Sequence, residues 1–310
     1  MAIVSSDFLA GVLTNFRALF EDSFNGALAV QGWTDLAIEL THNGETLTFE
    51  WFGTVPVMQD VTHDTVELRG LTPYNFSLAM SDYQSAIEVD RKSLERDQLN
   101  LIGPRIQQMA GEAARHPGFL LYDLVRANGN AYDASAFFAD TRVIGESANI
   151  DNSIAGTGTT VAQFQADLAS GRSAMRKFQD DRGRAINQPP NVIMVPPEME
   201  QVAWQSLNVN QAGQQDRAVP SADTGTFRAG GYLVVVNAEL TDVNNWYLFR
   251  VGGPAIRPFV YGIEKRPVLE SDTNPTSREN IIKRKFIYSV YGRYAVGMTD
   301  PRLGVLITNT

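Results

Sequence analysis

The sequence predicts an α+β fold, and three observations support that class. Helical periodicity is concentrated in the first two thirds of the chain, strand-like alternation dominates its end, and no internal repeat is present. The 310 residues are enough for one large domain or two modest ones, at about 150 residues per domain. The hydrophobic fraction of 44% is ordinary for a globular protein and too high for a disordered chain.

Residues 7–24 predict an amphipathic helix that Ser6 or Asp7 can cap. Its apolar side chains fall near one face: Phe8, Val12, Phe16, Leu19 and Phe20. Such a terminal helix could pack on its own domain or reach a neighbour, and we expect the first arrangement.

A hairpin is predicted next. Leu36–Leu40 and Leu47–Trp51 both alternate, and Asn43-Gly44 between them tolerates the positive φ of a tight turn. Residues 51–74 contain glycine and proline breaks and little helical periodicity, which predicts an extended excursion with few core residues. Strand alternation returns over residues 76–89.

The longest helical region follows this excursion. Pro104 suits a first helical position, so we expect one helix over Pro104–Arg115. Pro117 and Gly118 then predict a break, with a second helix over Phe119–Arg126.

The rest of the chain predicts two helices, an exposed loop and a series of strands. Residues 162–178 and 198–207 have helical patterns, 192–195 read as a buried strand, and 208–229 are rich in Gln, Asn, Gly and Ser. Further strands are expected at 232–236, 246–251, 259–263, 281–290 and 305–308.

The charge balance is acidic, with 26 Lys and Arg against 35 Asp and Glu and a net charge of −9. This argues against a generally basic nucleic-acid binder. The absence of cysteine excludes disulfides, thiolate nucleophiles and cysteine-ligated metal sites. No apolar run approaches the roughly 18 residues of a membrane span, and residues 1–7 do not resemble a secretory signal, so we expect no membrane partner.

We predict no catalytic residue, no cofactor and no metal site. The three histidines are dispersed without the spacing of metal ligands, and Gly156–Thr160 lacks the lysine of a phosphate-binding loop. No GxSxG motif for acyl transfer is present. Neighbouring carboxylates such as Asp90 and Asp97 are typical of solvated helix faces.

Basic residues cluster between Arg278 and Lys285. In a strand, Lys283 and Lys285 would share one face, because side chains alternate. Such a strand could contact nucleic acid or pair with acidic residues of another subunit. The negative net charge favours the second interpretation.

Several motifs occur in an informative order. They are Trp51-Phe52-Gly53 with Pro56, Ile87–Arg91 before Asp97-Gln98-Leu99, Pro104 with Met109–Ala114, Tyr132–Phe138, Val195–Glu200, Tyr291-Gly292 and Asp300-Pro301. This order resembles the major head subunits of phage Mu and Mu-like prophages, in detail from about Trp51 to Val209 and more loosely beyond. The match is partial at Leu99-Asn100-Leu101, where the family pattern ends differently.

The resemblance implies the Hong Kong 97-type coat fold. Five segments would follow: an N-terminal arm (1–35), an E-loop (36–85), the first part of a peripheral domain with a long spine helix (86–190), an axial domain (191–255) and the return strands of the peripheral domain (256–310). In that fold the E-loop is an extended two-stranded excursion. The axial loop 208–229 would then lie at the centre of a capsomer.

The E-loop supplies the candidate interface residues. It cannot bury Trp51, Phe52, Val55 and Val57 within its own subunit, and exposed apolar surface favours a partner. Arg69 is available there for charge pairs. Some coats of this fold cross-link through an E-loop lysine and a neighbour's asparagine, but residues 36–85 contain no lysine, so we expect no such bond.

The resemblance implies a non-enzymatic major capsid protein of a phage virion, assembled in the bacterial cytoplasm into hexamers and pentamers of an icosahedral shell. Its partners would be further copies of itself and scaffold, portal and decoration proteins. An acidic wall would enclose double-stranded DNA without gripping it. Two alternatives remain open: an encapsulin-like shell of a cellular compartment, and an acidic hydrolase that depends on Asp90 or Asp97.

Overall fold

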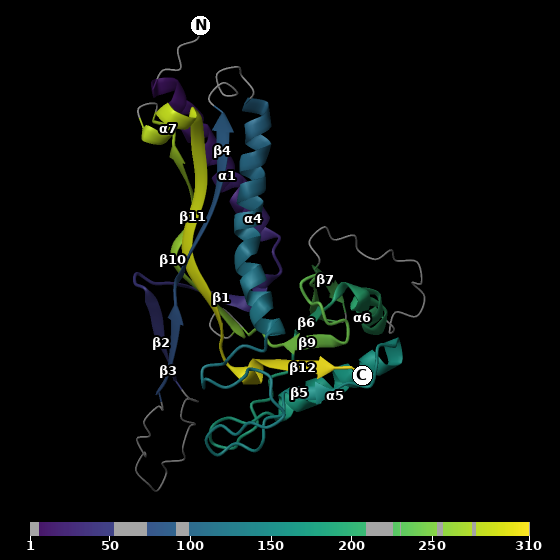
Figure 1. The fold of residues 1–310 in the computed structure, drawn as a ribbon. Coiled ribbons are helices and arrows are strands. Elements are labelled where there is room, and N and C mark those ends of the chain that lie inside the picture. Colours follow the sequence, from purple (N-terminus) through teal and green to yellow (C-terminus); the bar gives the residue numbers. More distant parts are fainter. Residues whose placement is uncertain are drawn as a thin grey trace, which may run out of the picture.

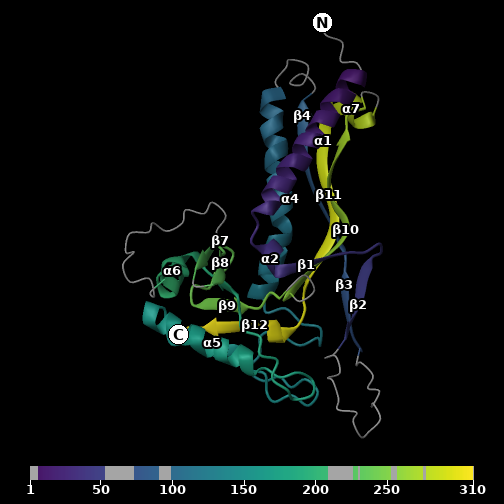
Figure 2. The same cartoon turned by 180° about the vertical axis from the view of Figure 1, so that it is seen from behind.

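The computed structural model describes residues 6–52, 73–90, 99–208, 226–229, 231–252, 257–274 and 277–309. Figure 1 shows a long upright unit of sheet and helix, with a second sheet lying across its foot. Figure 2 shows the same arrangement from behind, with α1 (Ser6–Ala29) crossing the upright unit. Both helices and sheets contribute, so the predicted α+β class is confirmed.

The upright sheet has four strands in the order β1-β10-β11-β4. Their bounds are β1 (Ala37–Thr41), β10 (Phe259–Asp272), β11 (Lys285–Met298) and β4 (Ser81–Asp90). β1 runs parallel to β10, with Ala37 opposite Phe259, and the other pairs are antiparallel. The hairpin predicted around Asn43-Gly44 is therefore wrong, because the two flanking strands belong to different sheets.

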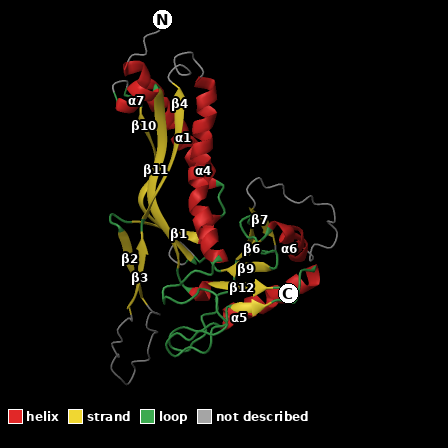
Figure 3. Cartoon of the chain, viewed as in Figure 1, coloured by secondary structure: helices red, strands yellow, loops and turns green. Residues whose placement is uncertain are grey.

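The strand after Asn43-Gly44 is β2 (Thr46–Phe52), and it pairs with β3 (Pro73–Ala79) as a separate two-stranded ribbon. Figure 3 shows this ribbon standing apart from the two larger sheets. A two-stranded ribbon is marginally stable alone, so its anchorage to the body decides its order.

α1 and α4 (Leu99–Arg126) cover one face of the upright sheet. Phe20, Ile106 and Tyr288 are at most 1% exposed in the core between them, and Phe16 meets Tyr288 edge-on at 5.5 Å. The predicted terminal helix therefore packs on its own domain, as expected, and is longer than 7–24 at both ends.

The break predicted at Pro117-Gly118 is wrong, because α4 is one helix that contains both Pro104 and Pro117. Each proline removes one backbone hydrogen bond. The apolar stripe nevertheless continues across Pro117, from Ala110 and Ala114 to Leu121, all fully buried. Tertiary packing of that stripe outweighs the local signal.

The second sheet has six strands in the order β5-β12-β9-β6-β8-β7. Their bounds are β5 (Ser153–Ala155), β12 (Gly304–Thr308), β9 (Asn245–Phe249), β6 (Val192–Val195), β8 (Tyr232–Val236) and β7 (Thr226–Ala229). α5 (Val161–Lys177), the 3-10 helix η1 (Pro197–Met199) and α6 (Glu200–Asn208) accompany it. Strands β5 and β12 join this sheet from outside the range 191–255. Residues 209–225 of the predicted axial loop lie outside the described residues.

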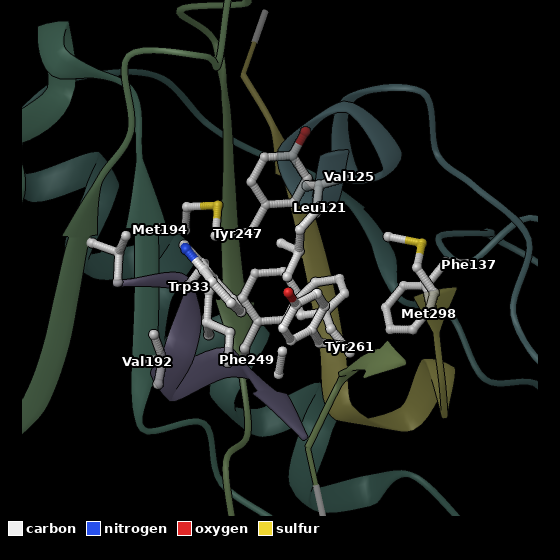
Figure 4. Close-up of a cluster of buried hydrophobic side chains, with 14 of the residues drawn as sticks. Trp33, Leu121, Val125, Phe137, Val192, Met194, Tyr247, Phe249, Tyr261 and Met298 are labelled. Atoms are coloured by element: carbon white, nitrogen blue, oxygen red, sulfur yellow. The ribbon is translucent and has the colours of Figure 1, made fainter. Parts of the chain in front are cut away.

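One continuous hydrophobic cluster joins the foot of the upright unit to the second sheet (Figure 4). Trp33 and Leu36 form the ends of the short helix α2 (Trp33–Leu36) and are at most 3% exposed. They share the cluster with Leu121 of α4, Phe249 of β9 and Phe259 of β10. Because interiors are close-packed, this cluster fixes the angle between the two units.

Two buried polar side chains hold the loops beneath the junction. The Asn152 amide donates to the carbonyls of Phe137 and Pro301, both at 2.9 Å, and its oxygen accepts from the Ala139 N–H at 2.8 Å. The Arg142 guanidinium lies 3.1 Å from the Asp133 carboxylate with its side chain only 4% exposed. These loops are therefore fixed parts of the fold.

Candidate assembly surfaces

The β2–β3 ribbon is anchored at its root by apolar side chains that surround a glycine. Leu47 is 6% exposed and lies opposite Leu78 in the ribbon. A Cβ atom at Gly262 of β10 would lie 3.0 Å from both the Leu47 Cδ2 and Met80 Cε atoms. The missing side chain at Gly262 thus allows the ribbon to approach the upright sheet. Beyond this root, Thr48 and Ser77 are exposed and the ribbon leads away from the body.

The predicted E-loop residues lie beyond that root. Trp51 and Phe52 end β2, where their backbones pair with Tyr74 and Pro73. Val55, Val57 and Arg69 lie outside the described residues. Their contacts with neighbouring copies stay a prediction.

The prediction that a basic strand begins at residue 281 is wrong, because β11 begins only at Lys285. Lys283 is the last residue of the short helix α7 (Arg278–Lys283) and is exposed. Arg284 follows with a φ of 53°, and Lys285 opens β11. The left-handed residue between them separates the two lysines into different elements, so they do not share a strand face.

Lys285 has an acidic partner within its own chain. Its Nζ atom lies 2.5 Å from Oε2 of Glu88 on the neighbouring strand β4. The hydrogen bond with Lys285 lowers the pKa of Glu88, and the same bond raises the pKa of Lys285. The structure therefore gives Lys285 a cross-strand role.

The sheet face opposite the helices carries further ion pairs. The Arg293 Nε atom lies 2.6 Å from Oδ1 of Asp82, and its Nη1 atom lies 2.9 Å from Oε1 of Glu264. The Tyr291 hydroxyl also donates to Asp82 at 2.6 Å. Hydrogen bonds from Arg293, and then from Tyr291, hold the pKa of Asp82 below its usual value. The charged side chains of this face therefore have partners within the chain.

A cleft of 190 Å³ lies between β4, β11 and α4. His116 of α4 lies in it, with Nδ1 2.8 Å from the Tyr294 hydroxyl and its ring 4.5 Å from that of Tyr83. Burial lowers the pKa of His116 and raises that of Tyr294. A neutral imidazole and a protonated phenol there make a packing contact between helix and sheet.

Sequence reasoning missed this aromatic contact and the ion pairs of the open sheet face. His116 was visible only as a residue before a proline, and nothing local indicated its two tyrosine neighbours. The Arg293 pairs could have been found only if the register between β4 and β11 had been known.

The described residues contain no group of three or more His, Asp or Glu side chains placed to hold a metal ion. Within the same part of the chain, no helix is both long and apolar enough to cross a membrane.

Comparisons with known proteins agree on one family. The sequence profile of a family described as phage capsid protein matches residues 77–307. The major capsid protein of Escherichia phage Mu is 23% identical over 251 residues, which cover 79% of this chain and 78% of that protein. The Mu-like prophage FluMu major head subunit of Haemophilus influenzae is 23% identical over 153 residues, 49% of this chain and 48% of that protein.

Solved structures confirm the fold. The procapsid of bacteriophage JBD30 aligns with a TM-score of 0.55 and 18% identity, and covers 97% of this chain and 76% of that one. The Hong Kong 97-type coat fold expected from the motif order is thus confirmed.

Proposed function

Because the chain belongs to the phage capsid protein family, we propose that it assembles into the hexamers and pentamers of an icosahedral phage head that encloses double-stranded DNA. The observation that carries the proposal is the β2–β3 ribbon, which leaves the body at a fixed root and carries Trp51 and Phe52 at its far end. Copies related by rotation can cover such ribbons, and repeated heterologous contacts that close give rings and shells.

The five predicted segments fit this proposal. The arm (1–35) contains α1 and the E-loop (36–85) contains the ribbon. The peripheral domain (86–190 and 256–310) contains α4 as its spine helix, and the axial domain (191–255) supplies four strands of the second sheet. In this proposal β5 and β12 tie the axial sheet to both parts of the peripheral domain.

A virion location, assembly in the bacterial cytoplasm, and scaffold, portal and decoration partners belong to the same proposal. The encapsulin-like alternative is not favoured, because both curated relatives are head proteins of a phage or prophage. The hydrolase alternative has no family support, since the chain belongs to a family of structural capsid proteins.

Electron microscopy of purified full-length protein, with a scaffold protein if one is needed, tests the proposal. Capsomers or closed shells are expected. A variant with Trp51→Ser and Phe52→Ser should reduce shell formation, whereas Thr48→Ser, at an exposed position just beyond the root, should not. If the wild type and both variants assembled equally well, Trp51 and Phe52 of the ribbon would not contribute to the interface.

A further inference from the structure

Helix α5 has an inner face that is fully engaged with the second sheet. The Phe164 ring stacks on Trp246 with 4.2 Å between centroids. A Cβ atom at Gly171 would lie 2.5 Å from Leu248 Cδ1, so the helix lies close against β9. The Asp167 carboxylate is buried and accepts hydrogen bonds from the N–H and hydroxyl of Thr157, both at 2.9 Å. The helix thus turns its one acidic side chain inward.

The outer face of α5 has a different composition. Its exposed residues are Ala162, Ala166, Ala169, Ser170, Arg172, Ser173, Arg176 and Lys177. This set, which we call the α5 outer face, holds three cations, no acid and no large apolar side chain. In a protein with a net charge of −9, this face is a local excess of positive charge, as is the cluster between Arg278 and Lys285. The helix packs on the face of the second sheet opposite α4, because Phe164 shares a cluster with Trp246 and Leu248 of β9 whereas α4 contributes to the cluster of Tyr247 and Phe249.

The fold accounts for only part of this charge. Arg176 and Lys177 lie in the last turn, where cations interact favourably with the helix dipole. Arg172 lies one turn earlier, and its spacing of four residues from Arg176 makes a mildly unfavourable like-charge pair. Within the described part of the chain, none of the three has an ion-pair partner, and the nearby Asp180 is held by Arg184 at 2.8 Å. The cations are therefore available to an external anion.

We propose that the α5 outer face contacts the backbone phosphates of the packaged DNA, an inference that rests on the proposed head function. At 1.5 Å of rise per residue, Arg172 and Arg176 are about 6 Å apart along the helix, close to two phosphate steps of about 3.4 Å on one strand. Non-specific duplex binding requires cations that reach phosphates and no apolar anchor.

The composition of this face favours DNA over an acidic protein segment. Protein interfaces are centred on aromatic or large aliphatic side chains, and the α5 outer face offers small residues between its cations. Three cations per subunit give weak, salt-screened contacts. Such contacts position a genome against the wall and still let it move.

The test compares two variants with the same net charge. One carries Arg172→Gln, Arg176→Gln and Lys177→Gln. The control carries Arg17→Gln, Arg105→Gln and Arg115→Gln, which remove three exposed cations from α1 and α4. Anisotropy of a labelled duplex of about 30 base pairs is measured with unassembled full-length protein between about 50 and 200 mM salt. A poly-glutamate peptide is the second probe, and circular dichroism and electron microscopy check folding and shell formation.

If each cation neutralises one phosphate, the α5 variant should reduce the slope of log K against log salt by about 0.9 per residue, or by about 2.7 in total. The control should keep the wild-type slope. Equal slopes for both variants would overturn the inference, as would a loss confined to the peptide, which would make the partner an acidic protein. If the wild type forms shells and the α5 variant binds DNA as the wild type does, only this inference is overturned. If the wild type forms no shells, the proposed function is overturned.

Discussion

Truncation of Leu47 to alanine should loosen the ribbon without unfolding the body. The Leu47 side chain is 6% exposed and packs at the ribbon root beside Gly262. Leu→Ala removes the equivalent of about three methylene groups at about 0.8 kcal/mol each, or about 2.4 kcal/mol. The Leu78 and Met80 side chains are only half-buried and lie at the same root, so they can repack into the gap and the additional cavity cost should be small.

That free energy acts on the docking of the ribbon. A loss of about 2.4 kcal/mol raises the population of the undocked ribbon about 50-fold, at 1.4 kcal/mol per factor of ten. Hydrogen–deuterium exchange measured on peptides from β2 and β3 should therefore accelerate, while exchange in β10 and β11 stays as in the wild type.

Thr48→Ala is the matched control, because Thr48 is the adjacent exposed residue of the same strand. It should leave the exchange of the ribbon unchanged. Unaltered exchange in the Leu47 variant, or equal acceleration in both variants, would refute the assignment of Leu47 as the anchor.

Three further predictions follow from other contacts. Gly118→Ala should destabilise the protein by about 1–3 kcal/mol in denaturant titrations although alanine favours helices, because its Cβ would lie 2.6 Å from Cδ1 of the Trp33 ring; equal or greater stability would contradict this packing. Because burial lowers the pKa of His116, the unfolded chain binds this proton more readily than the folded protein does. The contribution of His116 to the free energy of unfolding should therefore be fully present above pH 6.5 and decrease as the pH falls below that value. His116→Phe should make the melting temperature less dependent on pH in that range. Heated mature particles should give a single monomer band on an SDS gel, because residues 36–85 contain no lysine, and a covalent ladder that depends on the E-loop would count against this.

Local sequence patterns predicted most of the elements. The buried strand 192–195 and the helices around 162–178 and 198–207 were recovered nearly residue for residue. The apolar pattern of each segment is clear, and the prolines after Val195 mark the end of the strand. The structure adds a capping box at Thr160, at the start of α5. For these segments tertiary contacts agree with local preference.

The errors arise where distant contacts decide. β1 pairs with β10 across most of the chain, and no local signal around Asn43 could show that its neighbouring strands belong to different sheets. Pro117 is tolerated within α4 because packing on both sides continues the helix. Ile281 and Ile282 suggested a strand, but they are exposed on α7, beyond the end of the sheet core.

The candidate surfaces were predictable only in outline. The order of the motifs, and with it the family, could be recognised in the sequence. The anchoring of the ribbon at Gly262 required the three-dimensional arrangement, because it joins residues from distant segments. The cations of α5 lie on one helix, but only the structure shows which face of that helix the second sheet leaves exposed.

Assembly through the ribbon can be observed directly in a cryo-electron microscopy structure of particles assembled from the purified full-length chain. We expect closed shells in which the β2–β3 ribbon of each subunit lies on a neighbouring copy. A monodisperse monomer in solution, with the ribbon folded back on its own body, would contradict assembly through the ribbon.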